Sequence, residues 1–143
     1  MNKIVFFNHY HRGDLHTSKE FIKQIMKELK GVEFGYKHNN PEKLLNDMNL
    51  PTLGSPDDLD NSKAVLKSGD TLYINTWVGC QWDIFCKHGG INMNTFYEQW
   101  GLIYKAVNKF FDSNIKLYTF KEKYLPKIDY SFISKENKKS IDD

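Results

Sequence analysis

The sequence predicts an α/β domain in which a mostly parallel sheet carries helices on both faces. Residues 4–8 are the first indication, because an uninterrupted apolar run of this length is typical of a strand buried on both sides. The second indication is the order of the segments that follow. Strand-like and helix-like stretches alternate along the chain, which is the pattern of βαβ units and favours a parallel sheet.

A helix is expected after the first strand. Thr17 and Glu20 have the spacing of a capping box, in which two side chains bond to the free amides at a helix start. Gly31 is a natural helix end. The apolar residues of this segment fall on one helical face and are Phe21, Ile22, Ile25, Met26 and Leu29.

Three further segments follow before residue 62. Residues 32–36 carry apolar side chains at alternate positions, which predicts a strand. Asn40 and Pro41 suit a helix start, so a short helix through Met48 is expected. Residues 50–61 contain two prolines and a glycine and are expected to form a loop.

The second half of the chain begins with another strand. Residues 71–77 have high β propensity and predict a second interior strand, parallel to the first. Residues 78–92 have two consecutive glycines and no periodicity, which predicts a long loop. Asn94 or Thr95 is expected to cap the longest helix, and residues 115–120 are expected to form a last strand. The residues expected to face inward from the long helix are Phe96, Trp100, Ile103, Tyr104, Val107 and Phe111.

Length and composition favour a single Rossmann-like domain over residues 1–133, followed by a polar tail of residues 134–143. The net charge is only +2 and the lysines are scattered, so nucleic-acid binding is not favoured. The first apolar run is too short for a signal peptide, and no stretch approaches the ~20 apolar residues of a membrane span. We therefore expect a cytoplasmic protein in which Cys80 and Cys86 are reduced.

The loop expected between the first strand and the first helix carries the densest group of polar side chains. In an open α/β sheet, ligands bind outside the carboxyl ends of the strands, where this loop lies. Asp14 is a candidate general base toward a hydroxyl, and Arg12 is a candidate phosphate contact. The plainer alternative is that Asp14 caps the helix and the histidines are exposed polar residues. The candidate ligand-binding residues of this loop are His9, His11, Arg12, Gly13 and His16.

A metal site is a less favoured alternative. His9, His11, Asp14 and His16 are ligand types suited to zinc or iron, but their spacing matches no closed site. Cys80, Cys86 and His88 supply only three ligands. We therefore expect neither a bound metal nor a cofactor.

The long loop of residues 78–92 is expected to share one cleft with the first loop, because both leave the carboxyl ends of parallel strands. Trp77 and Trp82 lie at the start of this second loop and are candidates for stacking on a sugar ring. Trp100 lies inside the long helix and is expected to belong to the core.

The order of strand, loop ending in Arg12-Gly13-Asp14, and helix resembles the start of GT-B glycosyltransferases. It is most similar to the heptosyltransferase type, which builds bacterial lipopolysaccharide. The resemblance implies an acceptor-side domain in a bacterial protein, with Asp14 as the base that acts on the acceptor hydroxyl. It also implies a carbohydrate acceptor or a sugar nucleotide as ligand, and a separate carboxyl-terminal domain that binds the donor.

The expected function is therefore that of a glycosyltransferase-like domain that binds a carbohydrate acceptor, in bacterial surface polysaccharide synthesis. The first alternative is a stand-alone α/β domain that binds a small anion and catalyses nothing. The second is a metal-dependent hydrolase that uses the histidine cluster.

Overall fold

The structure is a computed structural model that describes residues 2–9, 12–38, 48 and 50–119, and for residues 12–16 the backbone alone. In chain order its elements are β1 (Lys3–Asn8), α1 (Arg12–Glu28), β2 (Glu33–His38), β3 (Val65–Ser68), β4 (Thr71–Asn75), α2 (Trp82–Lys87) and α3 (Met93–Phe111). The predicted tail and the helix start at Asn40 and Pro41 lie outside the described residues.

The sheet has four strands in the order β2-β1-β4-β3. β1 pairs in parallel with β2 on one side and with β4 on the other, so Phe6 is level with both Tyr36 and Ile74. The prediction that residues 4–8 and 71–77 contain two interior strands that run parallel is confirmed, although β4 ends at Asn75 rather than at Trp77. The sheet as a whole is mixed, however, because β3 pairs antiparallel with β4.

The antiparallel strand β3 is the main departure from the expected sheet. It is only four residues long and lies at the sheet edge, where a short strand carries little sequence pattern. A tight turn joins it to β4, and Gly69 takes a φ of +59° there, which favours glycine. The strand before this turn was not predicted from the sequence.

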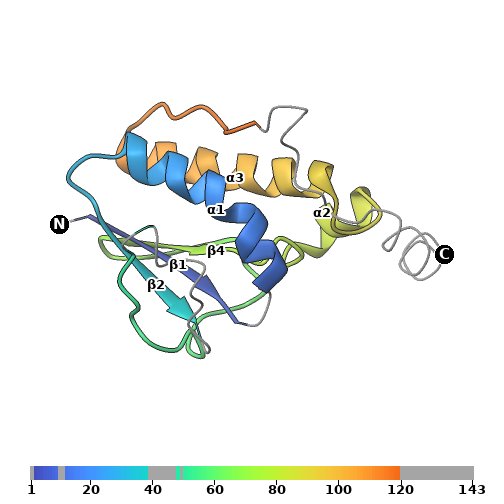
Figure 1. Cartoon of the computed structure of the whole chain (residues 1–143), viewed down its shortest axis with the longest axis horizontal. Coiled ribbons are helices and arrows are strands. Elements are labelled where there is room, and N and C mark those ends of the chain that lie inside the picture. Colours follow the sequence, from blue (N-terminus) through green and yellow to red (C-terminus); the bar gives the residue numbers. More distant parts are fainter. Residues whose placement is uncertain (1, 10–11, 39–47, 49, 120–143) are drawn as a thin grey trace.

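Helices α1 and α3 lie side by side over the same face of the sheet (Figure 1). The Phe21 ring of α1 stacks on the Trp100 ring of α3, with centroids 5.1 Å apart and planes 3° apart. The Trp100 indole donates a hydrogen bond to Ser18 Oγ (3.0 Å), and the Tyr104 hydroxyl donates to the Phe21 carbonyl (3.0 Å). Among the described residues, then, the long helices cover one face; the helix expected from residue 40 lies outside them apart from Met48.

Helix α1 begins five residues before the predicted capping box, so the expectation of a loop through His16 is wrong. Thr17 and Ser18 are buried inside the helix, and Ser18 accepts the Trp100 hydrogen bond. Their side chains therefore serve the core rather than a helix start. Tertiary packing here overrides the local capping signal.

The strand expected at residues 115–120 is absent from residues 115–119, the part of it that the structure describes. The Asn108 side chain instead bonds to both backbone groups of Ile115, accepting from its amide (2.8 Å) and donating to its carbonyl (3.0 Å). These backbone groups are thus satisfied without a neighbouring strand. A membrane-spanning helix would have to be both long and apolar, and none of the helices that the structure describes meets both conditions.

Candidate functional site

The carboxyl ends of β1 and β4 lie side by side and are joined by buried hydrogen bonds. The Asn8 amide donates to Thr76 Oγ1 (2.8 Å), and the Thr76 hydroxyl donates to the Phe7 carbonyl (3.1 Å). The Thr76 backbone amide also donates to the Phe7 carbonyl (2.9 Å). We call this end of the sheet, formed by Asn8, His9, Thr76 and Trp77, the carboxyl edge. Both segments predicted to form the site leave from it.

His9 is the first predicted ligand residue after β1, and it is buried rather than exposed. Its ring contacts Phe7 edge-on, with centroids 5.9 Å apart and planes 81° apart. The alternative that His9 is an exposed loop residue is therefore wrong. His11 lies outside the described residues.

Arg12, Gly13, Asp14 and His16 belong to the first turns of α1, with Asp14 as its third residue. Asp14 is thus inside the helix rather than at the capping position considered above. The first turn of a helix has backbone amides without intrahelical partners and a partial positive charge. Because α1 starts four residues after Asn8, this turn follows the carboxyl edge directly.

Trp77 is held tightly where the chain leaves β4. Its backbone amide donates to Asn75 Oδ1 (2.9 Å), and its carbonyl accepts from Gln99 Nε2 (2.9 Å). Its indole lies against Gly79, where a Cβ atom would come within 2.9 Å of the indole nitrogen. Trp77 is partly buried and packs against the core. Its ring is therefore part of the packed structure at the carboxyl edge, unlike a ring that projects into solvent.

Gln99 is a residue that the sequence analysis missed. It is fully buried on α3 and also donates to Cys80 Sγ (3.1 Å), so it joins α3 to the segment that leaves β4. A polar residue next to Trp100 on a mostly apolar helix face was the available signal. Such a buried amide normally has a specific hydrogen-bonding task.

The segment of residues 78–92 is not one long loop, because it contains the short helix α2. Trp82, the other predicted stacking residue, is the first residue of α2 and is 69% exposed. Its ring stacks on Phe85, with centroids 5.1 Å apart and planes 13° apart. The helix that follows the carboxyl edge therefore carries an exposed tryptophan that stacks on a partly buried phenylalanine.

Comparison with protein-family models, with curated proteins and with solved structures finds no match to this chain. The carboxyl edge is therefore interpreted from its own residues and geometry. The features next to it are the first turn of α1 and the stacked Trp82–Phe85 pair on α2.

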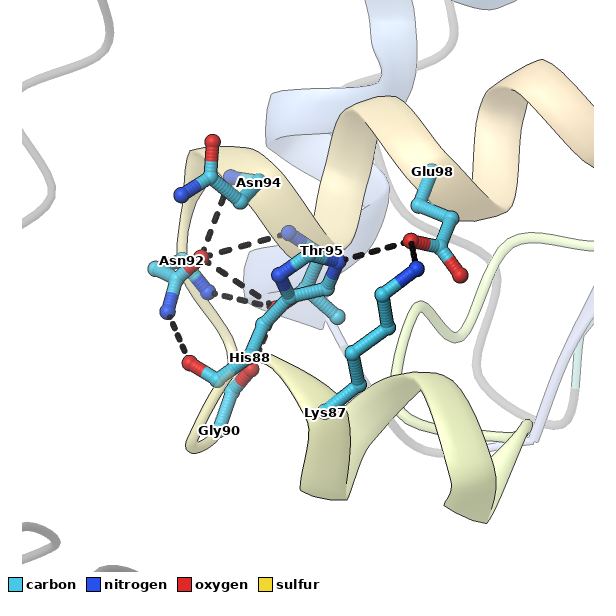
Figure 2. Close-up of polar contacts among 7 residues, drawn as sticks. All are labelled: Lys87, His88, Gly90, Asn92, Asn94, Thr95 and Glu98. Carbon is cyan, nitrogen blue, oxygen red and sulfur yellow. Dashed lines mark hydrogen bonds and ion pairs between the residues drawn. The ribbon is translucent and has the colours of Figure 1, made fainter.

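A cluster of three side chains, Lys87, His88 and Glu98, joins the end of α2 to α3 (Figure 2). Glu98 Oε1 accepts from Lys87 Nζ at 2.8 Å and contacts His88 Nε2 at 2.9 Å. Hydrogen bonds from Lys87 and His88 lower the pKa of the Glu98 carboxyl. The cluster therefore holds α2, the helix that carries the exposed Trp82, against α3.

The start of α3 lies beside this cluster (Figure 2). Asn92 caps the helix, with Oδ1 accepting from the amides of Asn94 (3.0 Å) and Thr95 (3.2 Å). The Asn92 side-chain amide also donates to the His88 carbonyl (2.8 Å), and the Thr95 hydroxyl donates to the Gly90 carbonyl. The predicted cap at Asn94 or Thr95 is wrong by two or three residues, because Asn92 and Thr95 together form the capping box.

The two cysteines differ in their surroundings, since Cys80 is buried and Cys86 is exposed, and neither is in a disulfide bond. Within the part of the chain that the structure describes, no group of three or more His, Cys, Asp or Glu side chains is arranged to hold a metal ion. Cys80, Cys86 and His88 accordingly do not come together as a ligand set.

Proposed function

We propose that the carboxyl edge binds a carbohydrate acceptor, as the acceptor-side domain of a GT-B glycosyltransferase does. The observation that carries this proposal is the hydrogen bond between Asn8 and Thr76. It joins the ends of β1 and β4, so that the segment with Arg12-Gly13-Asp14 and the segment with Trp82 leave the sheet at the same place. Ligands of open α/β sheets bind at such an edge.

The residue types near this edge suit a sugar. A pyranose has an apolar C–H face, and the exposed ring of Trp82, which stacks on Phe85, offers an aromatic surface on which that face can stack. Its hydroxyls need polar partners, which His9, Arg12 and His16 can supply. A carbohydrate therefore uses both the aromatic and the polar residues of the two segments.

Asp14 is proposed as the general base that takes the proton of the attacking acceptor hydroxyl. Its position in the first turn of α1 favours this role, because the positive end of a helix stabilises the ionised carboxylate. Only the ionised form accepts a proton. The sugar-nucleotide donor would be held by a separate carboxyl-terminal domain, as in the glycosyltransferases that the first segment resembles.

Saturation-transfer NMR of the full chain tests acceptor binding, with a panel of monosaccharides and lipopolysaccharide core oligosaccharides. We expect one class of sugar to bind, and Trp82→Ala to weaken that binding about tenfold, as loss of an aromatic stacking contact predicts. Leu102→Ala is the matched control, because Leu102 is also an exposed apolar residue but lies on α3. The proposal fails if no sugar binds, or if the two variants bind equally well.

Asp14→Asn separates the catalytic role from binding. In an assay that supplies the donor-binding half, we expect turnover at saturating acceptor to fall by roughly 10²–10⁴-fold. Acceptor binding should stay within about threefold of the unmodified chain. Unchanged turnover would leave Asp14 with a helix-stabilising role alone.

A second candidate function is the binding of a small anion without catalysis. The start of α1 at the carboxyl edge favours it, because free amides at a helix start attract phosphate. Titration with inorganic phosphate, followed by the backbone amide signals of residues 12–15, tests this function. Saturable shifts there, together with no binding to any sugar, would favour the anion-binding domain over the glycosyltransferase.

A further inference from the structure

A pocket lies at the end of the sheet opposite the carboxyl edge, where β1 and β4 begin. Its volume is about 570 Å³, which is within the usual range of small-molecule sites. It lies between the β3–β4 turn and the last turns of α3. The residues that define it are Val65, Lys67, Leu72, Ala106, Lys109 and Phe110.

The walls of this pocket are mainly apolar. Leu72 forms the buried floor, with only 2% of its surface exposed. Val65 and Phe110 are partly buried and pack against the core beside it. A polar ligand such as a free sugar would leave its hydroxyls facing these side chains, so the walls favour a ligand with an apolar body.

Charged groups lie at the rim. Lys67 Nζ is 5.2 Å from the centroid of the Phe110 ring, a cation–π contact that holds the ammonium beside the apolar wall without neutralising it. Lys109, the residue before Phe110, adds a second ammonium, and Asp70 is the one carboxylate among the lining residues. Two positive groups to one negative group favour an anionic ligand.

We propose that this pocket binds a small organic anion with an apolar body, of the class of medium-chain carboxylates. The hydrocarbon part would lie against Val65, Leu72 and Phe110, and the carboxylate would be bound by Lys67 and Lys109. This site is independent of the carboxyl edge, because it lies at the other end of the strands and shares no residue with it.

Octanoate is the probe, at concentrations below micelle formation, with octylammonium as the probe of opposite charge. Binding to the full chain is measured by calorimetry and by backbone amide shifts. We expect saturable octanoate binding with shifts at the pocket residues, at least about tenfold tighter than octylammonium binding. Equal affinity for the two probes would overturn the proposal, as would shifts that gather at Leu53, Trp82 and Leu102, the exposed apolar residues elsewhere.

Variants at the rim and in the wall complete the test. The double substitution Lys67→Gln, Lys109→Gln should weaken octanoate binding about tenfold or more, as expected for the loss of two charge-assisted hydrogen bonds. Lys105→Gln is the matched control, since Lys105 is on the same helix but does not line this pocket. Ala106→Trp should fill the pocket and abolish binding, with circular dichroism as the check on folding. Octanoate affinities that are the same in the double variant and the control would overturn the proposal.

Discussion

Asn8 and Thr76 are 68 positions apart in the sequence, yet their side chains are joined by a 2.8 Å hydrogen bond at the end of the sheet. Both residues are fully buried. The bond fixes the relative position of the two points at which the chain leaves β1 and β4. Every property proposed for the carboxyl edge depends on that juxtaposition.

Thr76→Val should destabilise the protein by about 1–3 kcal/mol, because it removes the acceptor of the Asn8 amide in a buried place. Chemical denaturation measures the free energy of unfolding. Thr76→Ser keeps the hydroxyl and should recover most of this loss. If the valine and serine variants were equally stable, the hydrogen bond would contribute nothing measurable.

The same substitution, tryptophan to alanine, can be compared at a buried and at an exposed position. Trp100 is 0% exposed, whereas Trp82 is 69% exposed. Trp100→Ala should cost about 3–5 kcal/mol, because it empties a large volume beneath Phe21. Trp82→Ala should change stability by no more than about 0.5 kcal/mol. Thermal and chemical unfolding of both variants check the contrast, and a large loss at Trp82 would show that its ring serves the fold rather than a ligand.

Asn92→Ala should lower stability by about 0.5–2 kcal/mol, because it removes the cap of α3. Asn94→Ala is the control two residues later, since Asn94 is exposed and takes part in the cap only through its backbone amide. Asn92→Asp keeps the capping oxygen and should lie between the two. Equal losses at positions 92 and 94 would contradict the assigned cap.

Glu98 should make stability depend on pH in the acid range. Because its pKa is lowered from the ordinary value of 4.5 in the folded state, its contribution is present above that value. The contribution is lost as the pH falls through the lowered pKa. The difference in unfolding free energy between the unmodified chain and Glu98→Gln should therefore shrink as the pH is lowered.

The control for this pH dependence is Glu33→Gln, which removes a charge at an exposed position on β2. Denaturation of both variants is compared with the unmodified chain at each pH. A constant difference for Glu98→Gln across the acid range would contradict the lowered pKa of Glu98.

Local patterns in the sequence were sufficient to predict the strands and the helix that bury apolar side chains. The run of residues 4–8 and the strand beginning at Thr71 are interior and parallel, as expected, because their side chains are stable only with neighbours on both sides. The inward face of α3 and the place of Trp100 in the core followed from helical periodicity in the same way. That the chain leaves β1 and β4 at one edge of the sheet followed from the parallel pairing.

Features that depend on distant partners were decided only by the tertiary structure. The start of α1 at Arg12, the antiparallel β3 and the short helix α2 have no pattern of their own that outweighs competing signals. Ser18 is the clearest case. In the sequence it lies within the predicted capping box, but in the structure it accepts a hydrogen bond from Trp100, 82 positions later in the chain. Gln99 is a similar case, because its side chain donates a hydrogen bond to the carbonyl of Trp77, just after the end of β4. The sequence alone thus determined which apolar residues of the strands and of α3 must be buried, because apolar side chains are stable only away from water. The fold determined which polar groups meet, because hydrogen bonds require particular distances between residues far apart in the chain.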